Sequence, residues 1–265
     1  MNPGRLIVPL SLIAAAGCVL AVAAAAEAPP SQSWSVPLDR APTVASAEVA
    51  GPGSAASASA SADGSAAPGS AAGSAAAAGN AERVDPTWAQ RVALRTGIPA
   101  RALQGYAGAS LTLSVEAPGC HLGWNTIAAI GDIESAHGSH GGAIDASGVT
   151  VPALLGPRLD GVEFDAVPDS DGGVFDGDAQ WDRAMGPLQF IPSTWQRWGA
   201  DGDGDGIANP QQIDDAALAA GRFLCAAGDL STVEGWRAAV LSYNHVERYV
   251  NQVAETANRY AGLDG

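Results

Sequence analysis

One acidic side chain, Glu134, lies in an apolar setting where it could serve as a general acid. It belongs to the segment IAAIGDIESAHG (residues 127–138), and its spacing from Ile127 and Ile130 puts the three side chains on one helix face. Gly138 is expected as the C′ residue, so Glu134 would lie in the last turn, near the negative end of the helix dipole. Burial and the dipole both raise the pKa of a carboxyl group, as general acid catalysis requires. The alternative is a helix-end glutamate that faces solvent.

A second group of acidic residues has the spacing of a calcium loop. The run DGDGDG (residues 201–206) places Asp201, Asp203 and Asp205 at loop positions 1, 3 and 5 and a glycine at position 6, as in the opening of an EF-hand. Position 7 would offer the carbonyl of Ile207. The alternative is an acidic turn that binds no ion.

The charge balance narrows the possible partners. The chain of 265 residues has a formal net charge of −15 and contains no lysine. Nucleic-acid binding requires a basic face, so this class of function is not expected.

Three regions follow one another along the chain. Residues 1–26 have an early arginine, a long apolar run and small residues at the end, which predicts a signal peptide or a retained membrane anchor. Cys18 is an alternative site of lipidation. Residues 27–84 are mostly Ala, Ser, Gly and Pro and are expected to form a flexible linker. Residues 85–265 would be one folded, extracytoplasmic domain, expected to act as a monomer.

Cys120 and Cys225 are the two cysteines of this domain. A pair of cysteines in an exported domain predicts a disulfide. The alternative is two buried free thiols.

The elements that must position these residues are mainly helical. Asp85 and Pro86 predict a cap and a first helical residue. Asn125 is expected to cap the helix that carries Glu134. Further helices are expected from residue 99, over 192–198, over 214–227, from residue 231 and over 249–260. The segment 139–182 is rich in Gly, Asp and Pro, and at most a small hairpin is expected there.

Three separated segments carry a family resemblance. Glu134-Ser135, the run MGPLQF (residues 185–190) followed by IPSTW, and the run SYNH (residues 242–245) occur in an order and spacing that resemble the lytic murein transglycosylases. The similarity is greatest to the membrane-bound lytic transglycosylase B family in its actinobacterial form. The resemblance implies a mainly α, α+β lysozyme-like fold, with peptidoglycan glycan strands as the substrate.

The resemblance also implies roles for single residues. Glu134 would be the sole catalytic acid and base, and Ser135, Gln189, Tyr243 and Asn244 would contact the substrate. In this family the last acidic calcium ligand comes late in the loop. Because position 12 of the loop is Gln212, the resemblance assigns this ligand to Asp215, with Asp214 as second choice. Calcium would then have a structural role.

The expected reaction cleaves the β-1,4 bond between N-acetylmuramic acid and N-acetylglucosamine and closes a 1,6-anhydro ring. An ordinary glycosidase needs a second carboxylate about 5–9.5 Å from the first. Asp132 lies on another face of the helix, whereas Asp145, Asp160 and Asp178 stay open as candidates. The alternatives are a muramidase that hydrolyses the same bond and a non-catalytic, calcium-stabilised wall-binding module.

Overall fold

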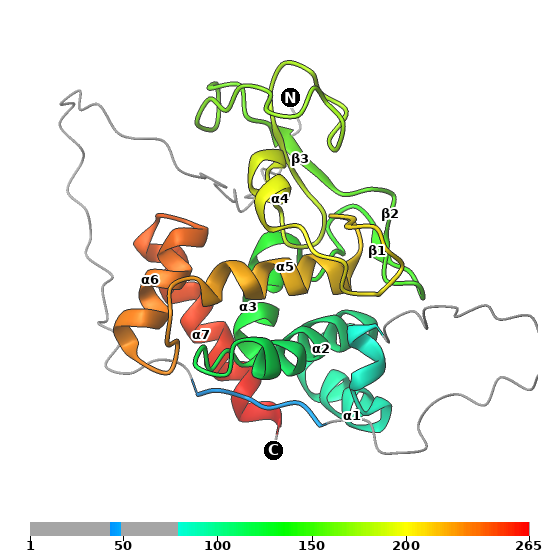
Figure 1. The fold of residues 1–265 in the computed structure, drawn as a ribbon, viewed down its shortest axis with the longest axis vertical. Helices are drawn as coiled ribbons and strands as arrows, with labels where there is room; N and C mark the ends of the chain where they lie inside the picture. The colour runs from blue at the N-terminus through cyan, green and yellow to red at the C-terminus, as the bar shows by residue number, and fades with distance from the viewer. Residues whose placement is uncertain (1–42, 49–78, 265) are drawn as a thin grey trace, which may run out of the picture.

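The computed structural model describes residues 43–48 and 79–264, and this part of the chain is mainly helical (Figure 1). The helices are η1 (Asn80–Arg83), α1 (Pro86–Thr96), α2 (Ala100–Glu116), α3 (Trp124–Ser135), α4 (Pro192–Trp198), α5 (Ile213–Cys225), α6 (Val233–Tyr243) and α7 (Glu247–Asp264). The strands are β1 (Ala143–Ile144), β2 (Thr150–Val151), β3 (Leu155–Arg158) and β4 (Arg183–Met185). The expected mainly helical fold class is confirmed.

Local signals set the two ends of α1 as the sequence predicts. The Asp85 carboxylate accepts hydrogen bonds from the backbone N–H groups of Thr87 and Trp88, both at 2.8 Å. Pro86 opens the helix, where its missing N–H leaves no bond unmade. Gly97 ends it with a left-handed backbone (φ 78°).

The helix α3 lies in the middle of the helical body, where it contacts α2, α5 and α7 (Figure 1). Trp124, Ile127 and Ile130 are fully buried. Gly131 is buried as well, and the Tyr106 hydroxyl of α2 occupies the space that a Cβ at this position would need. Most residues of α3 are buried, and Asp132, which pairs with Arg259, is one of its partly exposed positions. Any polar side chain that α3 carries inward is therefore removed from water.

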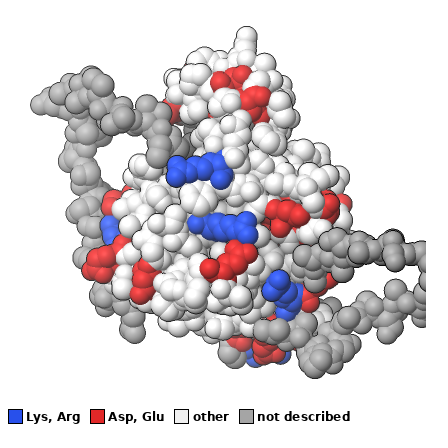
Figure 2. All heavy atoms as spheres, viewed as in Figure 1, with Lys and Arg blue, Asp and Glu red and all other residues white. Residues whose placement is uncertain are grey.

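The segment between α3 and α4 contains two small antiparallel sheets. In one, β1 pairs with β2; in the other, β3 pairs with β4, with Leu155 opposite Met185. Residues 159–182 form a lobe of loops that projects from the helical body, and Figure 2 shows acidic side chains exposed on it. The sequence predicted at most one small hairpin here. The β3–β4 pairing spans this whole lobe, so no local turn signal marks it.

A disulfide joins Cys120 to Cys225, with the two Cα atoms 5.3 Å apart. This confirms the expected pair. The bond links the loop after α2 to the last residue of α5, 105 residues further along the chain. Closing a loop of this length would contribute about 4–5 kcal/mol in the chain-entropy model.

Both predicted ends of α3 are wrong. Gly123 is its N-cap, and Asn125 lies inside the first turn, where its side chain bonds to other segments. At the other end α3 stops at Ser135, and Ala136 is the left-handed residue (φ 48°), two positions before Gly138. An alanine at this position carries no sequence signal for a helix end, because left-handed backbone disfavours side chains.

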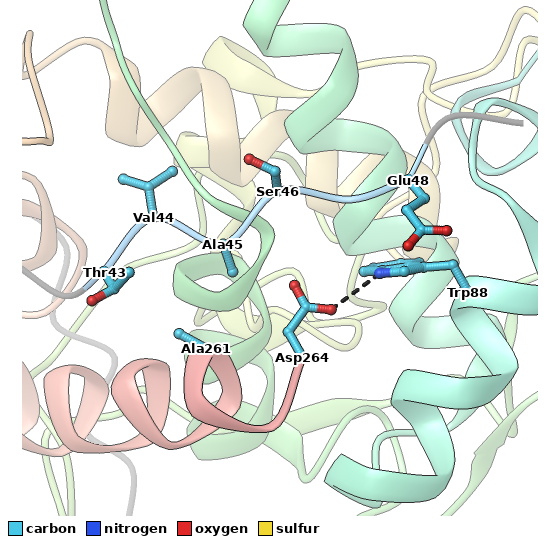
Figure 3. Close-up of a pocket in the computed structure, with 8 residues that line it drawn as sticks. All are labelled: Thr43, Val44, Ala45, Ser46, Glu48, Trp88, Ala261 and Asp264. Atoms are coloured by element: carbon cyan, nitrogen blue, oxygen red, sulfur yellow. Dashed lines mark hydrogen bonds between the residues drawn. The ribbon is translucent and has the colours of Figure 1, made fainter.

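Residues 43–48, here called the strap, lie across the N-terminal end of α3 and the C-terminal part of α7 (Figure 3). The Asn125 side chain accepts a hydrogen bond from the backbone N–H of Ala45 (3.1 Å). It donates to the carbonyls of Thr43 (2.8 Å) and Ala257 (3.1 Å). Ala45 itself is only 6% exposed. A buried side-chain amide thus recognises an extended backbone from the segment predicted as a linker.

The other end of the strap contacts the start of α1. The backbone carbonyl of Glu48 accepts the N–H of Asp85 at 2.9 Å, and its carboxylate pairs with Arg91 at 2.8 Å. A pocket of about 360 Å³ lies between the strap, Trp88 and Asp264, whose side chains are hydrogen-bonded to each other (Figure 3). The prediction of a flexible linker therefore does not describe residues 43–48.

The first helix of the described residues, η1, starts at Asn80, five residues before the predicted domain boundary at residue 85. The predicted signal peptide or anchor (residues 1–26) lies outside the described residues, as does most of the predicted linker. Within the described part of the chain, no helix has the length and hydropathy needed to cross a membrane.

We predict that Asn125→Ala will destabilise the full chain by about 2 kcal/mol, because three hydrogen bonds are lost and buried backbone groups of the strap are left unpaired. For a domain of this size the melting temperature should fall by about 4–8 °C. Asn258→Ala is the matched control, since that exposed side chain makes one 3.3 Å bond to Thr43. Thermal unfolding followed by circular dichroism measures both.

The same measurement on a chain that begins at residue 79 tests whether the strap is responsible. Without the strap, Asn125→Ala should cost clearly less than it does in the full chain. An equal cost in both chains would show that Asn125 acts through Ala257 and not through the strap.

Candidate active site

Glu134 lies in the last turn of α3 and is 5% exposed. Its Oε1 accepts a hydrogen bond of 2.7 Å from the hydroxyl of Tyr249. Burial raises the pKa of Glu134 to about 8, although the bond from Tyr249 lowers it. Its Oε2 has no hydrogen-bond partner among the described residues. The carboxyl group is therefore mainly protonated at neutral pH, and one of its oxygens is buried without a hydrogen bond.

Tyr249 was not among the residues that the sequence singled out. It is the third residue of α7 and is buried, and its hydroxyl group reaches the carboxyl of Glu134 across 115 positions of the chain. Burial, and after it the proximity of Glu134, raises the pKa of Tyr249, so its hydroxyl group stays a hydrogen-bond donor. Its position shortly after the SYNH run was the one available signal.

A left-handed turn directly after Ser135, the last residue of α3, fixes the end of this helix. Ala136 and His137 have φ values of 48° and 58°. The imidazole of His137 lies between two hydroxyl groups, with Nδ1 3.1 Å from Tyr106 and Nε2 3.0 Å from Tyr260. Burial lowers the pKa of His137 to about 4. A neutral imidazole thus joins the end of α3 to both α2 and α7.

The GPLQF segment forms a tight turn between β4 and α4, in which Met185 and Phe190 exchange backbone hydrogen bonds. This turn, residues 186–190, is here called the site turn. The hydroxyl of Ser135 donates to the carbonyl of Pro187 at 2.6 Å. The hydroxyl of Tyr243 donates to the carbonyl of Leu188 at 2.7 Å. Residues from all three predicted segments are therefore brought together.

The other predicted substrate contacts take part in the local structure of the site. Gln189 has a left-handed backbone (φ 50°), and its side-chain amide donates to the carbonyl of Gly186 at 2.9 Å. The hydroxyl of Ser135 also accepts the N–H of Gly138 at 2.7 Å. Asn244 is 3% exposed, and its side-chain oxygen accepts the N–H of Val246 at 3.2 Å. These hydrogen bonds of Gln189 and Asn244 are thus local, each to a residue close by in the chain.

No second carboxylate is among the groups that shift the pKa of Glu134 within the described part of the chain. The three acidic residues that the sequence left open are engaged elsewhere. Hydrogen bonds from Ser147 and neighbouring N–H groups lower the pKa of Asp145. Asp178 pairs with Arg158 at 2.6 Å, and the carboxylate of Asp160 accepts the N–H of Val162 at 3.0 Å.

The predicted calcium loop brings three carboxylates together. One oxygen each of Asp201, Asp203 and Asp215 lie within 4.8 Å of one another. Asp215 is fully buried and accepts backbone N–H groups from Gly202 (2.6 Å) and Asn209 (2.8 Å). Burial raises the pKa of Asp215 to about 7. Oxygen donors packed this closely match the ligand chemistry of a hard divalent cation.

The structure distinguishes the two candidates for the last ligand. Asp214 forms a salt bridge with Arg101 of α2 and accepts a hydrogen bond of 2.9 Å from the side-chain amide of Gln212. Asp215 points into the loop, as its bonds to the loop backbone show. Asp205 and Ile207 are exposed on the outer part of the loop. The geometry fits Asp215 as the late acidic ligand.

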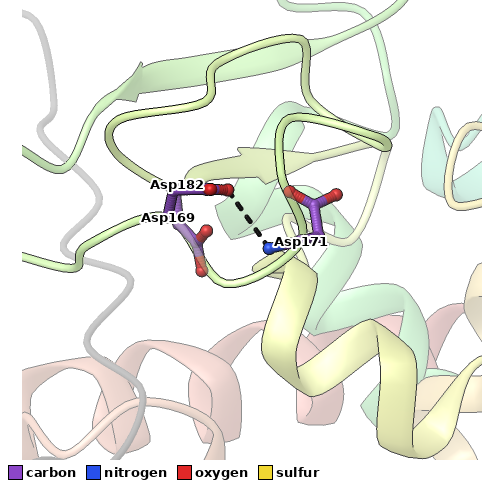
Figure 4. Close-up of side chains that lie close together, drawn as sticks. All are labelled: Asp169, Asp171 and Asp182. Atoms are coloured by element: carbon purple, nitrogen blue, oxygen red, sulfur yellow. Dashed lines mark hydrogen bonds between the residues drawn. The ribbon is translucent and has the colours of Figure 1, made fainter.

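A second set of carboxylates lies in the lobe. Asp169, Asp171 and Asp182 each place one oxygen within 4.8 Å of the others (Figure 4). Asp182 is buried and binds the backbone N–H and the hydroxyl of Ser170. These carboxylates order the loop by accepting its backbone N–H groups, and nothing further at this place points to an ion.

Similarity to known proteins is found in a solved structure and in a family model. A solved structure, SltB3 from Pseudomonas aeruginosa in complex with NAG-anhNAM-pentapeptide, aligns with 67% of this chain at 17% identity and a TM-score of 0.28. The chain spans 60% of the length of that protein. No curated protein matches the chain significantly.

Residues 175–259 match the family model described as "Transglycosylase SLT domain". This match covers roughly a third of the chain. It contains the site turn, the predicted calcium loop (residues 201–215, here called the acidic loop), Tyr243 and Tyr249, whereas Glu134 precedes it. Over residues 175–259 the chain is therefore similar to the Transglycosylase SLT domain.

Proposed function

We propose that this chain is a peptidoglycan lytic transglycosylase of the lysozyme-like type and that Glu134 is its single general acid and base. The observation that carries the proposal is the buried carboxyl of Glu134, with a pKa raised to about 8 and one buried oxygen that no described residue hydrogen-bonds. The similarity of residues 175–259 to a transglycosylase domain supports the substrate class. Among such enzymes, the membrane-bound lytic transglycosylase B family in its actinobacterial form remains our assignment.

The reaction starts when Glu134 donates its proton to the glycosidic oxygen between N-acetylmuramic acid and N-acetylglucosamine. As the bond from C1 to that oxygen breaks, the carbonyl oxygen of the muramoyl 2-acetamido group bonds to C1, so no second protein carboxylate is needed. The 6-hydroxyl then attacks C1 and displaces the acetamido oxygen. Glu134 takes up the hydroxyl proton, which closes the 1,6-anhydro ring and restores the acid.

Tyr249 has a defined part in this cycle. When Glu134 is protonated, Tyr249 donates to Oε1, so the proton is directed to the free Oε2. When Glu134 is ionised, the same bond stabilises a carboxylate that is otherwise buried without a partner. The donor thus makes both protonation states accessible.

Two other functions would use the same fold. A muramidase would deliver water instead of the 6-hydroxyl to C1 and give reducing ends. A wall-binding module without catalysis would not need a buried carboxyl with a free oxygen, which costs folding free energy. That cost favours an enzyme.

We further propose that the acidic loop binds calcium and that the protein acts outside the cytoplasm on the cell wall. Asp201, Asp203 and Asp215 would supply side-chain ligands, joined by Asp205 and the carbonyl of Ile207. The proposed ion would neutralise the repulsion between carboxylates packed within 4.8 Å. Its role would be structural, since Glu134 supplies the proton.

Glu134→Gln should abolish lysis of peptidoglycan, with a loss of several orders of magnitude, because glutamine cannot donate the proton. The fold should persist, since Tyr249 can still donate to the amide oxygen. Mass spectrometry of muropeptides released by the unaltered protein should show ends that lack one water relative to hydrolysed products. Reducing ends would support the muramidase, and no release at all would support the binding module.

The same substitution should change how stability depends on pH. The pKa of Glu134 is about 8 in the folded state and about 4.5 in the unfolded chain. The protonated carboxyl therefore contributes stability that is fully present below pH 4.5 and is lost as pH rises to 8. Relative to the unaltered protein, the free energy of unfolding of Glu134→Gln should therefore rise over this window, by at most about 1.4 kcal/mol per pH unit. The difference between the two melting temperatures should grow in the same direction. A margin independent of pH would contradict the raised pKa.

Calcium should raise the melting temperature increasingly with concentration, by an amount equivalent to about 2.7 kcal/mol at a hundredfold excess over its Kd. Magnesium should do less, because it prefers a tighter octahedral shell. Asp203→Ala should remove the shift, whereas Asp165→Ala, an exposed acid outside the loop, should keep it. Equal melting temperatures in chelator and in calcium would refute the site. Loss of the shift in Asp169→Ala instead would move the site to the lobe.

A further inference from the structure

The site turn is hydrogen-bonded both to residues close to Glu134 and to the segment just before β3. From the side of Glu134, Ser135 and Tyr243 donate to the carbonyls of Pro187 and Leu188. At the first residue of the turn, the N–H of Gly186 donates to the carbonyl of Leu154 at 2.9 Å. Whatever positions Leu154 therefore positions the start of the turn that contacts the residues around Glu134.

The side chain of Gln211 binds both backbone groups of Leu154. The side-chain oxygen of Gln211 accepts the N–H of Leu154 at 2.8 Å, and its amide nitrogen donates to the carbonyl of Leu154 at 3.0 Å. The same oxygen accepts the hydroxyl of Thr150, and the backbone carbonyl of Gln211 accepts the N–H of Thr150 at 2.9 Å. Gln211 thus binds β2 and the residue just before β3 at once.

Gln211 is itself part of the acidic loop. Its N–H donates to the Asn209 side chain at 3.0 Å, and the N–H of Asn209 donates to the carboxylate of Asp215 at 2.8 Å. The residue between them, Pro210, places its carbonyl oxygen where a Cβ at Gly186 would lie, so the loop and the site turn are in direct contact. Gly186 has a φ of 70°, which a side chain would disfavour further.

We propose that Gln211 is a positioning residue that couples occupation of the acidic loop by a divalent cation to the geometry of the site turn. A cation bound by Asp215 and its neighbours orders Asn209 and, through it, Gln211. Gln211 then fixes Leu154, Leu154 fixes Gly186, and the turn presents its carbonyls to Ser135 and Tyr243. This inference rests on the calcium site and on the catalytic role proposed above.

Backbone amide hydrogen exchange, measured by NMR with calcium or with chelator, tests the coupling in the full chain. In the unaltered protein, calcium should slow exchange in the loop (residues 201–215) and also at Leu154 and Gly186. In Gln211→Met, which keeps the length of the side chain but removes its polar atoms, calcium should still protect the loop. Leu154 and Gly186 should exchange about tenfold faster than in the unaltered protein and no longer respond to calcium.

Three comparisons make the result specific. The amide of Thr150 bonds to the backbone of Gln211 and should stay protected in Gln211→Met. Gln252→Met, an exposed glutamine of α7, should behave as the unaltered protein. Gln211→Glu keeps the acceptor for Leu154 but not the donor, and it should restore part of the protection of Leu154 while Gly186 stays unprotected. A merely destabilised fold would instead raise exchange throughout the core.

The outcomes separate this inference from the proposals on which it rests. If calcium protects the loop but not Leu154 and Gly186 in the unaltered protein, the coupling is refuted and the calcium site stands. If Gly186 responds to calcium equally in Gln211→Met, the coupling does not pass through Gln211. If calcium protects no part of the loop, the cation site and the coupling both fail. Lysis of peptidoglycan, tested with Glu134→Gln, is independent of all three results.

Discussion

Burial of a single carboxyl group at the end of α3 is the constraint on which the rest of the structure depends. An ionised carboxylate without a partner is costly inside a protein, so the folded state keeps Glu134 protonated. Enclosure by α2, α5 and α7 creates this environment, with Ile127 and Ile130 buried on the same helix as Glu134. One donor from α7, Tyr249, moderates the effect without cancelling it. The acid is therefore a property of the packing of four helices and not of α3 alone.

The position of Glu134 also depends on where the C-terminal end of α3 lies. Two consecutive left-handed residues, Ala136 and His137, turn the backbone away directly after Ser135. Such backbone is unfavourable for residues with side chains, so tertiary contacts must compensate. The imidazole of His137 supplies them by reaching hydroxyl groups on α2 and α7. The contacts of His137 that compensate for the unfavourable turn therefore also hold the end of α3 that carries Glu134.

The periphery stabilises this centre in different ways. The strap binds at the N-terminal end of α3, opposite to the end that carries Glu134, through the buried amide of Asn125. The disulfide joins α5 to the loop after α2. The acidic loop lies against the site turn through Pro210 and Gln211. Each of the three joins a different pair of segments.

The sequence by itself determined the features that depend on neighbours along the chain. It specified the start of α1 at Asp85, the placement of Glu134 in a last helical turn, the alternating carboxylates from Asp201 to Asp205, and the cysteine pair. Only the tertiary structure decided which residues face each other across long separations. Tyr249 meets Glu134, Asp215 rather than Asp214 enters the loop, Asn125 binds the strap instead of capping α3, and Gln211 reaches Leu154. Each of these contacts is a hydrogen bond or an ion pair. Its partner either lies far away in the chain or, as with Asp214 and Asp215, is one of two equivalent neighbours. Local periodicity contains no information about either choice.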